Sequence, residues 1–252
     1  MSKRVSFLSL AAFALVTCAL PDPDEAHTRS DAIVGGTVTH GDPAVVSLVV
    51  AQGNFNSGSY CTGTLIGPKT VLTAAHCIEV YGANQPYAVA FGTVSTQPDR
   101  LVSVAHQVPH PDYRDVGGAP QWDFGLLQLA QAVTDVDPIP LNTTAMSNAH
   151  VGLSIRHVGF GVTSAAQQGG GTRREVTYNV RSVTQLLIES GASGRQTCSG
   201  DSGGPGFMTL PGQTVEHVVG VVSFGEESCT YGGYDGRVDR AATWIQTTMA
   251  AW

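Results

Sequence analysis

The hydrophobic residues of this chain come in short runs, and no long amphipathic segments alternate with them. From Ile33 onward, β-branched and other apolar residues form brief segments that Gly, Pro, Asn and Asp separate. Segments of this kind between turn residues predict β-strands. The plainest are 44–50, 70–75, 87–91, 101–108, 124–129, 151–158, 175–183 and 215–224. The pattern therefore predicts an all-β barrel or sandwich.

The C-terminal end departs from this pattern. Asp239 is placed to cap a helix that extends through the last residue of the chain. Apolar side chains at helical spacing would share one face of this helix: Trp244, Ile245, Thr248, Met249 and Trp252. We expect the helix to dock on the rest of the protein through its two tryptophans.

The N-terminal end has the layout of a secretory signal. Lys3 and Arg4 precede an apolar run to Leu20, and a polar, acidic stretch follows. We expect a signal peptide at 1–19, a short propeptide at 20–32 and one domain at 33–252. The preferred interpretation is a secreted protein, and the alternative is a lipid anchor at the cell envelope through Cys18. No later run is long enough to predict a membrane span.

Charge and cysteine content narrow the possible partners. The net charge is −7 and the basic residues do not cluster, which argues against a nucleic-acid partner. Besides Cys18 the chain has four cysteines, and an even number in an exported protein predicts two disulfides. Spacing alone leaves three possible pairings. No Cys-x-x-Cys motif occurs, so we expect no metal site.

Three local motifs carry residues suited to nucleophilic catalysis. Ser202 lies in a Gly-rich turn, Cys198 to Pro205, and a serine hydroxyl needs a nearby base to react. His76 adjoins a cysteine that could hold it in place, and Asp123 precedes an apolar strand. Each motif alone also has a plain interpretation: a loop, a structural histidine, and a solvated acid at a strand end. A phosphate-binding loop is excluded because no Gly-Lys-Ser/Thr follows the turn.

Taken together, the motifs resemble those of the trypsin/chymotrypsin family of serine proteases across residues 33–252. The matching segments follow the family's order: Ile33-Val34-Gly35-Gly36, Thr73-Ala74-Ala75-His76-Cys77, Asp123 before its strand, Gly200 to Pro205, and Ser223-Phe224-Gly225. The resemblance implies two packed six-stranded antiparallel β-barrels with a C-terminal α-helix and an active site between the barrels.

The resemblance also implies the role of each catalytic group. Ser202 would attack the scissile carbonyl, His76 would act as general base and then acid, and Asp123 would orient the imidazole. The backbone N–H groups of Gly200 and Ser202 would form the oxyanion hole. No cofactor is required. The implied disulfides are Cys61–Cys77 and Cys198–Cys229.

The family's activation mechanism is implied as well. Cleavage after Ala32 would free the ammonium group of Ile33 to pair with the buried carboxylate of Asp201. Digestive trypsins have a basic residue before the cut, whereas this chain has Asp31-Ala32. We therefore expect a different protease to make the cut.

The specificity pocket departs from that of trypsin. Gln196 falls at the pocket floor, where trypsin has an Asp, and a neutral amide does not replace that charge. Ser223, Gly225 and Gly233 match the family's pocket walls. Asp235 either restores a negative charge near the pocket base or is a surface loop acid. We expect a basic or polar side chain to be preferred before the cleaved bond.

Two rival classes follow from the same motifs. A catalytically dead relative would act as a binding protein, but such relatives usually lose a motif that this chain retains. An esterase with a Gly-x-Ser-x-Gly elbow would need the order Ser, Asp, His, and here Ser comes last. We expect a monomer whose partners are polypeptide substrates, an activating protease and protein inhibitors.

Overall fold

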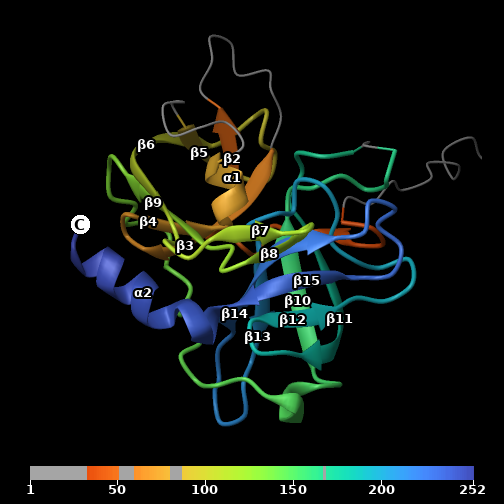
Figure 1. The fold of residues 1–252 in the computed structure, drawn as a ribbon. Helices are drawn as coiled ribbons and strands as arrows, with labels where there is room; N and C mark the ends of the chain where they lie inside the picture. Colours follow the sequence, from red (N-terminus) through yellow and green to blue (C-terminus); the bar gives the residue numbers. More distant parts are fainter. Residues whose placement is uncertain (1–32, 51–59, 80–86, 167–168) are drawn as a thin grey trace, which may run out of the picture.

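The computed structural model describes residues 33–50, 60–79, 87–166 and 169–252, and it contains two closed β-barrels (Figure 1). In the first barrel the strands close in the order β2-β3-β4-β9-β6-β5, and every pairing is antiparallel. The bounds of its strands are β2 Val45–Val50, β3 Cys61–Gly67, β4 Thr70–Thr73, β5 Tyr87–Phe91, β6 Arg100–Pro109 and β9 Gly125–Leu129.

The second barrel is built from the later part of the chain. Its strands follow the order β11-β10-β13-β14-β15-β12, and the pairing of β12 with β11 closes the ring. Strand β1, Thr37–Val38, adds to β11 from outside. The bounds are β10 Ser154–Gly159, β11 Arg174–Val183, β12 Leu187–Ser190, β13 Pro205–Met208, β14 His217–Gly225 and β15 Gly233–Arg237. The predicted double barrel is confirmed.

Short elements connect and flank the barrels. They are the helix α1 (Ala75–Glu79), the hairpin of β7 (Arg114–Val116) and β8 (Ala119–Gln121), the 3₁₀ turn η2 (Asn148–His150) and the helix α2 (Val238–Ala250). The strand expected at 70–75 ends at Thr73, because Ala75 already belongs to α1.

One continuous hydrophobic core joins the two barrels. Leu65 and Leu126 from the first barrel belong to the same cluster of buried side chains as Val158 and Val221 from the second. Burial of apolar surface at this junction stabilises the barrels against each other. The junction is therefore a rigid place on which to hold catalytic groups that come from distant parts of the sequence.

The predicted C-terminal helix forms, but it begins earlier and without the expected cap. Arg237 is the N-cap residue and provides no side-chain cap, because β15 runs directly into α2. Asp239 lies in the first turn, where it accepts hydrogen bonds from the Arg237 guanidinium (2.6 Å) and the Met146 N–H (3.1 Å). Ile245 is fully buried, and the packing of Trp244, Met249 and Trp252 on the core confirms the predicted docking face.

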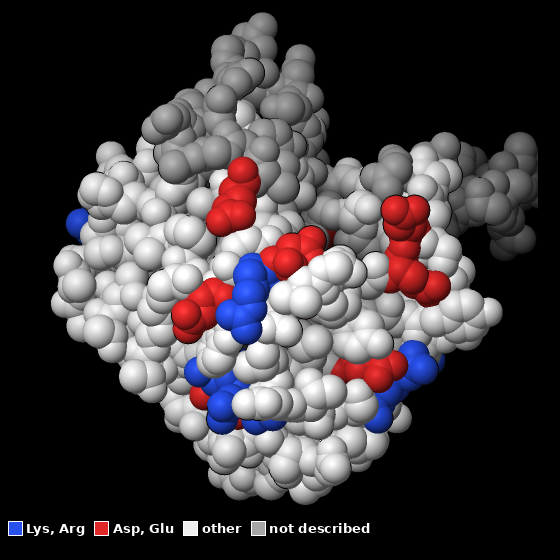
Figure 2. Space-filling view, in the orientation of Figure 1, with Lys and Arg blue, Asp and Glu red and all other residues white. Residues whose placement is uncertain are grey.

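Both disulfides that the resemblance implied are present, Cys61–Cys77 and Cys198–Cys229. On the face drawn in Figure 2, acidic and basic side chains lie interspersed. Within the described ranges, no helix is long and apolar enough to cross a membrane. The expected signal peptide, the propeptide and Cys18 lie outside the described residues.

Candidate active site

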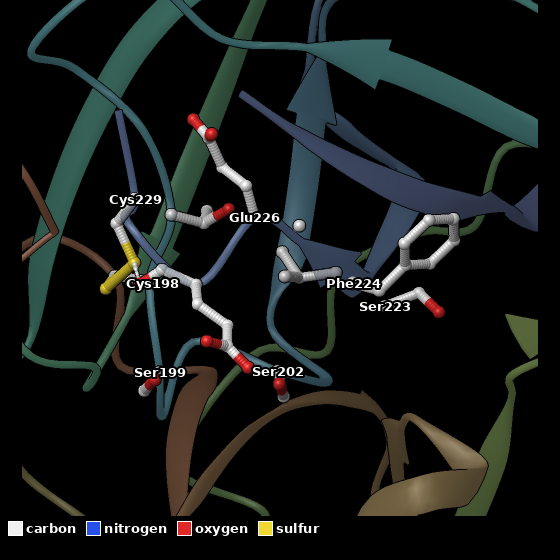
Figure 3. Close-up of a pocket in the computed structure, with 11 residues that line it drawn as sticks. Cys198, Ser199, Ser202, Ser223, Phe224, Glu226 and Cys229 are labelled. Atoms are coloured by element: carbon white, nitrogen blue, oxygen red, sulfur yellow. Dashed lines mark hydrogen bonds between the residues drawn. A yellow bond between two sulfur atoms is a disulfide. The ribbon is translucent and has the colours of Figure 1, made fainter. Parts of the chain in front are cut away.

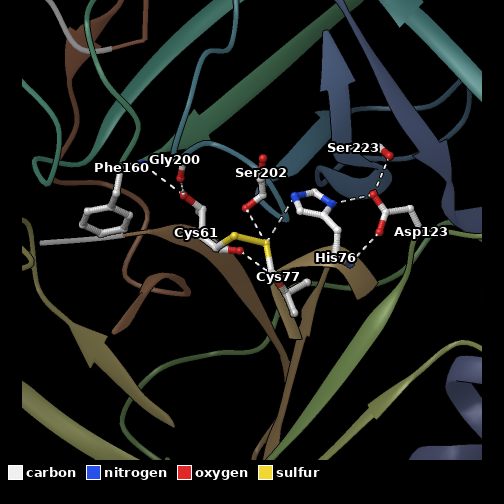
Figure 4. Close-up of a disulfide and its surroundings, with 10 residues drawn as sticks. Cys61, His76, Cys77, Asp123, Phe160, Gly200, Ser202 and Ser223 are labelled. Atoms are coloured by element: carbon white, nitrogen blue, oxygen red, sulfur yellow. Dashed lines mark hydrogen bonds and ion pairs between the residues drawn. A yellow bond between two sulfur atoms is a disulfide. The ribbon is translucent and has the colours of Figure 1, made fainter. Parts of the chain in front are cut away.

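His76 lies on α1, a single helical turn that follows β4 in the first barrel. The next residue, Cys77, is joined to Cys61 at the start of β3, so a covalent bond ties this turn to the barrel. The ring of His76 is 24% exposed, and Figure 4 shows it between Ser202 and Asp123. A partly exposed imidazole on a fixed turn can reach both a substrate and a protein partner.

Asp123 is buried, with 1% exposure, and hydrogen bonds compensate its carboxylate for the loss of water. One oxygen accepts from the backbone N–H of His76 at 2.9 Å. The other lies 2.7 Å from His76 Nδ1 and also accepts from the Ser223 hydroxyl at 2.5 Å. An imidazole held this way carries its proton on Nδ1, which leaves Nε2 as the basic nitrogen.

Ser202 lies beside the free edge of this imidazole. The Cys77 sulfur is 3.7 Å from His76 Nε2 and 3.6 Å from the Ser202 carbonyl oxygen, so both groups share one neighbour (Figure 4). Within the described ranges, the Ser202 hydroxyl makes no hydrogen bond to the imidazole in this uncut chain.

The backbone around Ser202 leaves two N–H groups available. The Ser199 carbonyl accepts from the Val162 N–H at 2.8 Å, and in a trans peptide this points the Gly200 N–H the opposite way. Gly200 has φ 93°, a conformation that favours glycine. Among the described residues, neither the Gly200 N–H nor the Ser202 N–H has an acceptor. Two unpaired donors beside a serine hydroxyl suit a negatively charged oxygen.

A cavity of about 180 Å³ opens beside Ser202 (Figure 3). Ser223 and Gly225, which the resemblance matched to pocket walls, line this cavity, and the Cys198–Cys229 disulfide forms part of its wall. Glu226 and Glu227 also line it. The Glu226 carboxylate accepts hydrogen bonds from the Thr230 N–H and hydroxyl, each at 3.0 Å, and from the Tyr231 N–H. Glu226 thus organises its own loop.

The other residues expected in the pocket do not line this cavity. Gln196 is 1% exposed, donates its N–H to the Val34 carbonyl at 3.1 Å, and leaves its amide oxygen without a partner among the described residues. Gly233 lies close to the Thr197 hydroxyl, behind the cavity wall.

Asp235 occupies neither of the two places considered for it. It is 2% exposed, which excludes a surface loop, and its carboxylate lies 2.8 Å from His157 Nε2 inside the second barrel. The His157 ring also stacks on Tyr178, with centroids 5.0 Å apart. No local motif links this pair, since the two residues are 78 positions apart in the chain. A carboxylate already paired with an imidazole is poorly placed to attract a substrate cation.

Asp201 is a buried acid without a cation. Its two oxygens accept from the Gly161 N–H (2.8 Å) and the Cys198 N–H (2.9 Å), and no ion pair to it exists among the described residues. Burial raises the pKa of Asp201 to about 7. Ile33 is fully buried in the hydrophobic cluster of the second barrel, and the next residue, Val34, bridges to Gln196.

The side chains around His76 are not arranged to bind a metal ion. The described residues contain one cluster with potential ligand atoms, Cys61, His76 and Cys77. Two of its three members are joined in a disulfide, which leaves no thiolate to bind a metal.

A histidine held by a buried carboxylate, next to a serine in a tight glycine turn at the junction of two β-barrels, defines the class of serine proteases. The family model described as Trypsin matches residues 33–245, and the chain belongs to this family and is a serine endopeptidase. It is 30% identical to Serine protease ea of Drosophila melanogaster, over 91% of this chain and 71% of that protein. It is 31% identical to Serine protease SP24D of Anopheles gambiae (86% and 81% covered) and 29% identical to Trypsin of Simulium vittatum (92% and 97%).

Proposed function

We propose that this chain is the precursor of a secreted serine endopeptidase in which Ser202, His76 and Asp123 hydrolyse internal peptide bonds through an acyl-enzyme. One observation carries the proposal: the Asp123 carboxylate lies 2.7 Å from His76 Nδ1, while Nε2 faces the sulfur that also contacts Ser202. This leaves the basic nitrogen on the side of the nucleophile. Its substrates are polypeptides.

The reaction follows from the geometry in two halves. The Ser202 oxygen attacks the scissile carbonyl carbon while His76 Nε2 takes the hydroxyl proton, and Asp123 stabilises the imidazolium that forms. The carbonyl oxygen becomes negative and receives hydrogen bonds from the Gly200 and Ser202 N–H groups. His76 returns its proton to the leaving amine, and water then replaces the amine and releases the acid in the reverse sequence.

Activation is proposed to require a cut before Ile33, made by another protease. Among the described residues no cation forms an ion pair with the buried Asp201 carboxylate, and the new ammonium of Ile33 would supply one. Ile33 also has φ 52° in the uncut chain, a strained conformation for a β-branched residue. Cleavage removes the carbonyl carbon that defines this torsion, so the strain disappears with the bond.

The preference for the side chain before the cleaved bond is proposed to be polar or basic. Gln196 is buried and neutral, and Asp235 is paired with His157, so neither provides the free carboxylate of a trypsin pocket. Glu227 at the cavity leaves negative charge near a bound side chain. The selectivity for Lys and Arg should therefore be weaker than in trypsin.

The test uses protein that starts at Ile33, produced by placing an engineered cleavage site before that residue. A fluorophosphonate probe, which reacts with activated serines, should label this form and should not label Ser202→Ala. The matched control is Ser154→Ala, an exposed serine at the start of β10, which should label like the wild type. A wild type that is correctly processed and remains unlabelled would favour the binding-protein class.

A mixed peptide library then measures the substrate preference of the labelled enzyme. Cleavage after polar and basic residues supports the proposed pocket. Cleavage confined to positions after large apolar residues contradicts it and leaves the catalytic assignment intact.

A further inference from the structure

Thr62 is a fully buried residue of β3 in the first barrel, yet its partners include the active-site turn of the second barrel. Its backbone N–H donates to the Ser202 carbonyl at 2.8 Å, and its hydroxyl donates to the Gly200 carbonyl at 2.9 Å. One residue therefore holds both ends of the segment Gly200 to Ser202. That segment carries the two N–H groups assigned to the oxyanion hole.

The Thr62 hydroxyl is also an acceptor. The Phe160 N–H donates to it at 3.1 Å, which completes a chain of hydrogen bonds from Phe160 through the hydroxyl to the Gly200 carbonyl. The next residue, Gly161, donates its N–H to the Asp201 carboxylate at 2.8 Å. Val162 then donates its N–H to the Ser199 carbonyl at 2.8 Å, so the loop after β10 contacts the active-site turn at three points, and one of them runs through Thr62.

Gly200 needs such an external restraint. With φ 93° it has a conformation open to glycine, and glycine has the largest backbone freedom of any residue. The Ser199 carbonyl fixes the peptide plane before Gly200, through the Val162 N–H. The plane after Gly200 is held at its carbonyl by the Thr62 hydroxyl and at its N–H, that of Asp201, by the Cys198 carbonyl at 3.0 Å. With both planes held, the Gly200 N–H keeps its direction as charge develops on the substrate oxygen.

We propose that the Thr62 hydroxyl is a positioning group for the oxyanion hole, acting through Gly200 on the transition state rather than on substrate binding. This inference rests on the proposed function, since it needs an oxyanion at this place. Preorganised donors stabilise charge without reorganising during the reaction, and a loosened donor loses part of that effect.

The test compares Thr62→Val, which keeps the shape of the side chain and removes the hydroxyl, with Thr62→Ser, which keeps the hydroxyl. We expect Thr62→Val to lower kcat about tenfold, less than the roughly 10²–10³-fold cost of losing a donor itself, and to leave KM unchanged. Affinity for a peptide aldehyde, which forms a tetrahedral oxyanion on Ser202, should fall by the same factor. Thr62→Ser should restore both values.

The matched control is Thr64→Val. Thr64 is buried two residues along the same strand, on the same side of β3, and it should keep the wild-type kcat. If Thr62→Val does not fold, Thr62→Ala provides the same comparison with a smaller side chain.

The outcomes separate the two proposals. A wild type that is inactive in the Ile33-started form defeats the proposed function. An active wild type together with a Thr62→Val variant of unchanged kcat and aldehyde affinity overturns the role of Thr62. A loss confined to KM overturns it as well, because it would place Thr62 in substrate binding.

Discussion

The buried carboxylate of Asp201 makes the stability of the uncut chain, the proposed precursor, depend on pH. In the folded chain its pKa is about 7, above the ordinary value of 3.8, and burial is the largest cause. The hydrogen bonds from the Cys198 and Gly161 N–H groups, followed by the charges of His157 and Arg174, lower this pKa and only partly offset the burial. A raised pKa means that the folded state binds the proton more tightly than the unfolded state. The stabilisation is therefore complete below about pH 4 and is lost as the pH rises through about 7.

The magnitude follows from the shift itself. Each unit of difference between the folded and the unfolded pKa corresponds to about 1.36 kcal/mol. A pKa raised from 3.8 to about 7 therefore corresponds to about 4 kcal/mol. Asp201→Asn has no titrating proton at this site. The free energy of unfolding of the wild-type precursor, measured relative to Asp201→Asn, should fall by about 4 kcal/mol between pH 4 and pH 8.

The assay is urea unfolding of the uncut precursor at several pH values, with Ser202→Ala in both proteins to prevent self-cleavage. The same pair is measured after a cut before Ile33, where the new ammonium should hold Asp201 ionised. In the cut form Asp201→Asn should instead destabilise the protein at pH 8, by about 3–5 kcal/mol, because it leaves a buried ammonium unpaired. A pH-independent difference in the uncut form would refute the reasoning, as would identical behaviour of the two forms.

Three further predictions concern groups around the site. Ser223→Ala removes a hydrogen bond to the Asp123 carboxylate, and such a bond to a charged acceptor is worth about 1.5–3 kcal/mol. The kcat on a peptide substrate should therefore fall at least about tenfold. An unchanged kcat would show that this bond does not contribute to catalysis. Asp235→Ala leaves the buried His157 imidazole unpaired and should lower the free energy of unfolding by about 1–3 kcal/mol. Urea titration of this variant, of His157→Gln and of the double variant should show that the two losses of stability are not additive. Additive losses would contradict the pairing. Replacing both cysteines of Cys198–Cys229 by serine opens a loop of 31 residues, and in the loop-closure model this should lower the free energy of unfolding by about 4 kcal/mol. A urea midpoint equal to that of the wild type would contradict this prediction.

The all-β architecture and the catalytic motifs could be read from the chain because they are local. Alternating apolar runs between turn residues predict strands wherever the partners lie, and most of the predicted bounds differ from the observed strands by only a few residues. The motifs around His76, Asp123 and Ser202 are likewise contiguous in sequence. Their family resemblance supplied the disulfide pairing that spacing alone left open.

The hydrogen-bond partners of the buried polar side chains were decided by the tertiary structure. Asp235 looked equally suited to a pocket or to the surface, and only the closure of one barrel that contains both β10 and β15 brings it to His157. The first residue of α2 also depends on tertiary contacts, because Asp239 accepts a hydrogen bond from the Arg237 guanidinium instead of capping the helix. In the sequence Thr62 is an ordinary strand residue, and only the packing of the two barrels brings its hydroxyl to the Gly200 carbonyl. Hydrogen bonds between residues far apart in the chain depend on how whole strands pack, and no local pattern encodes that packing.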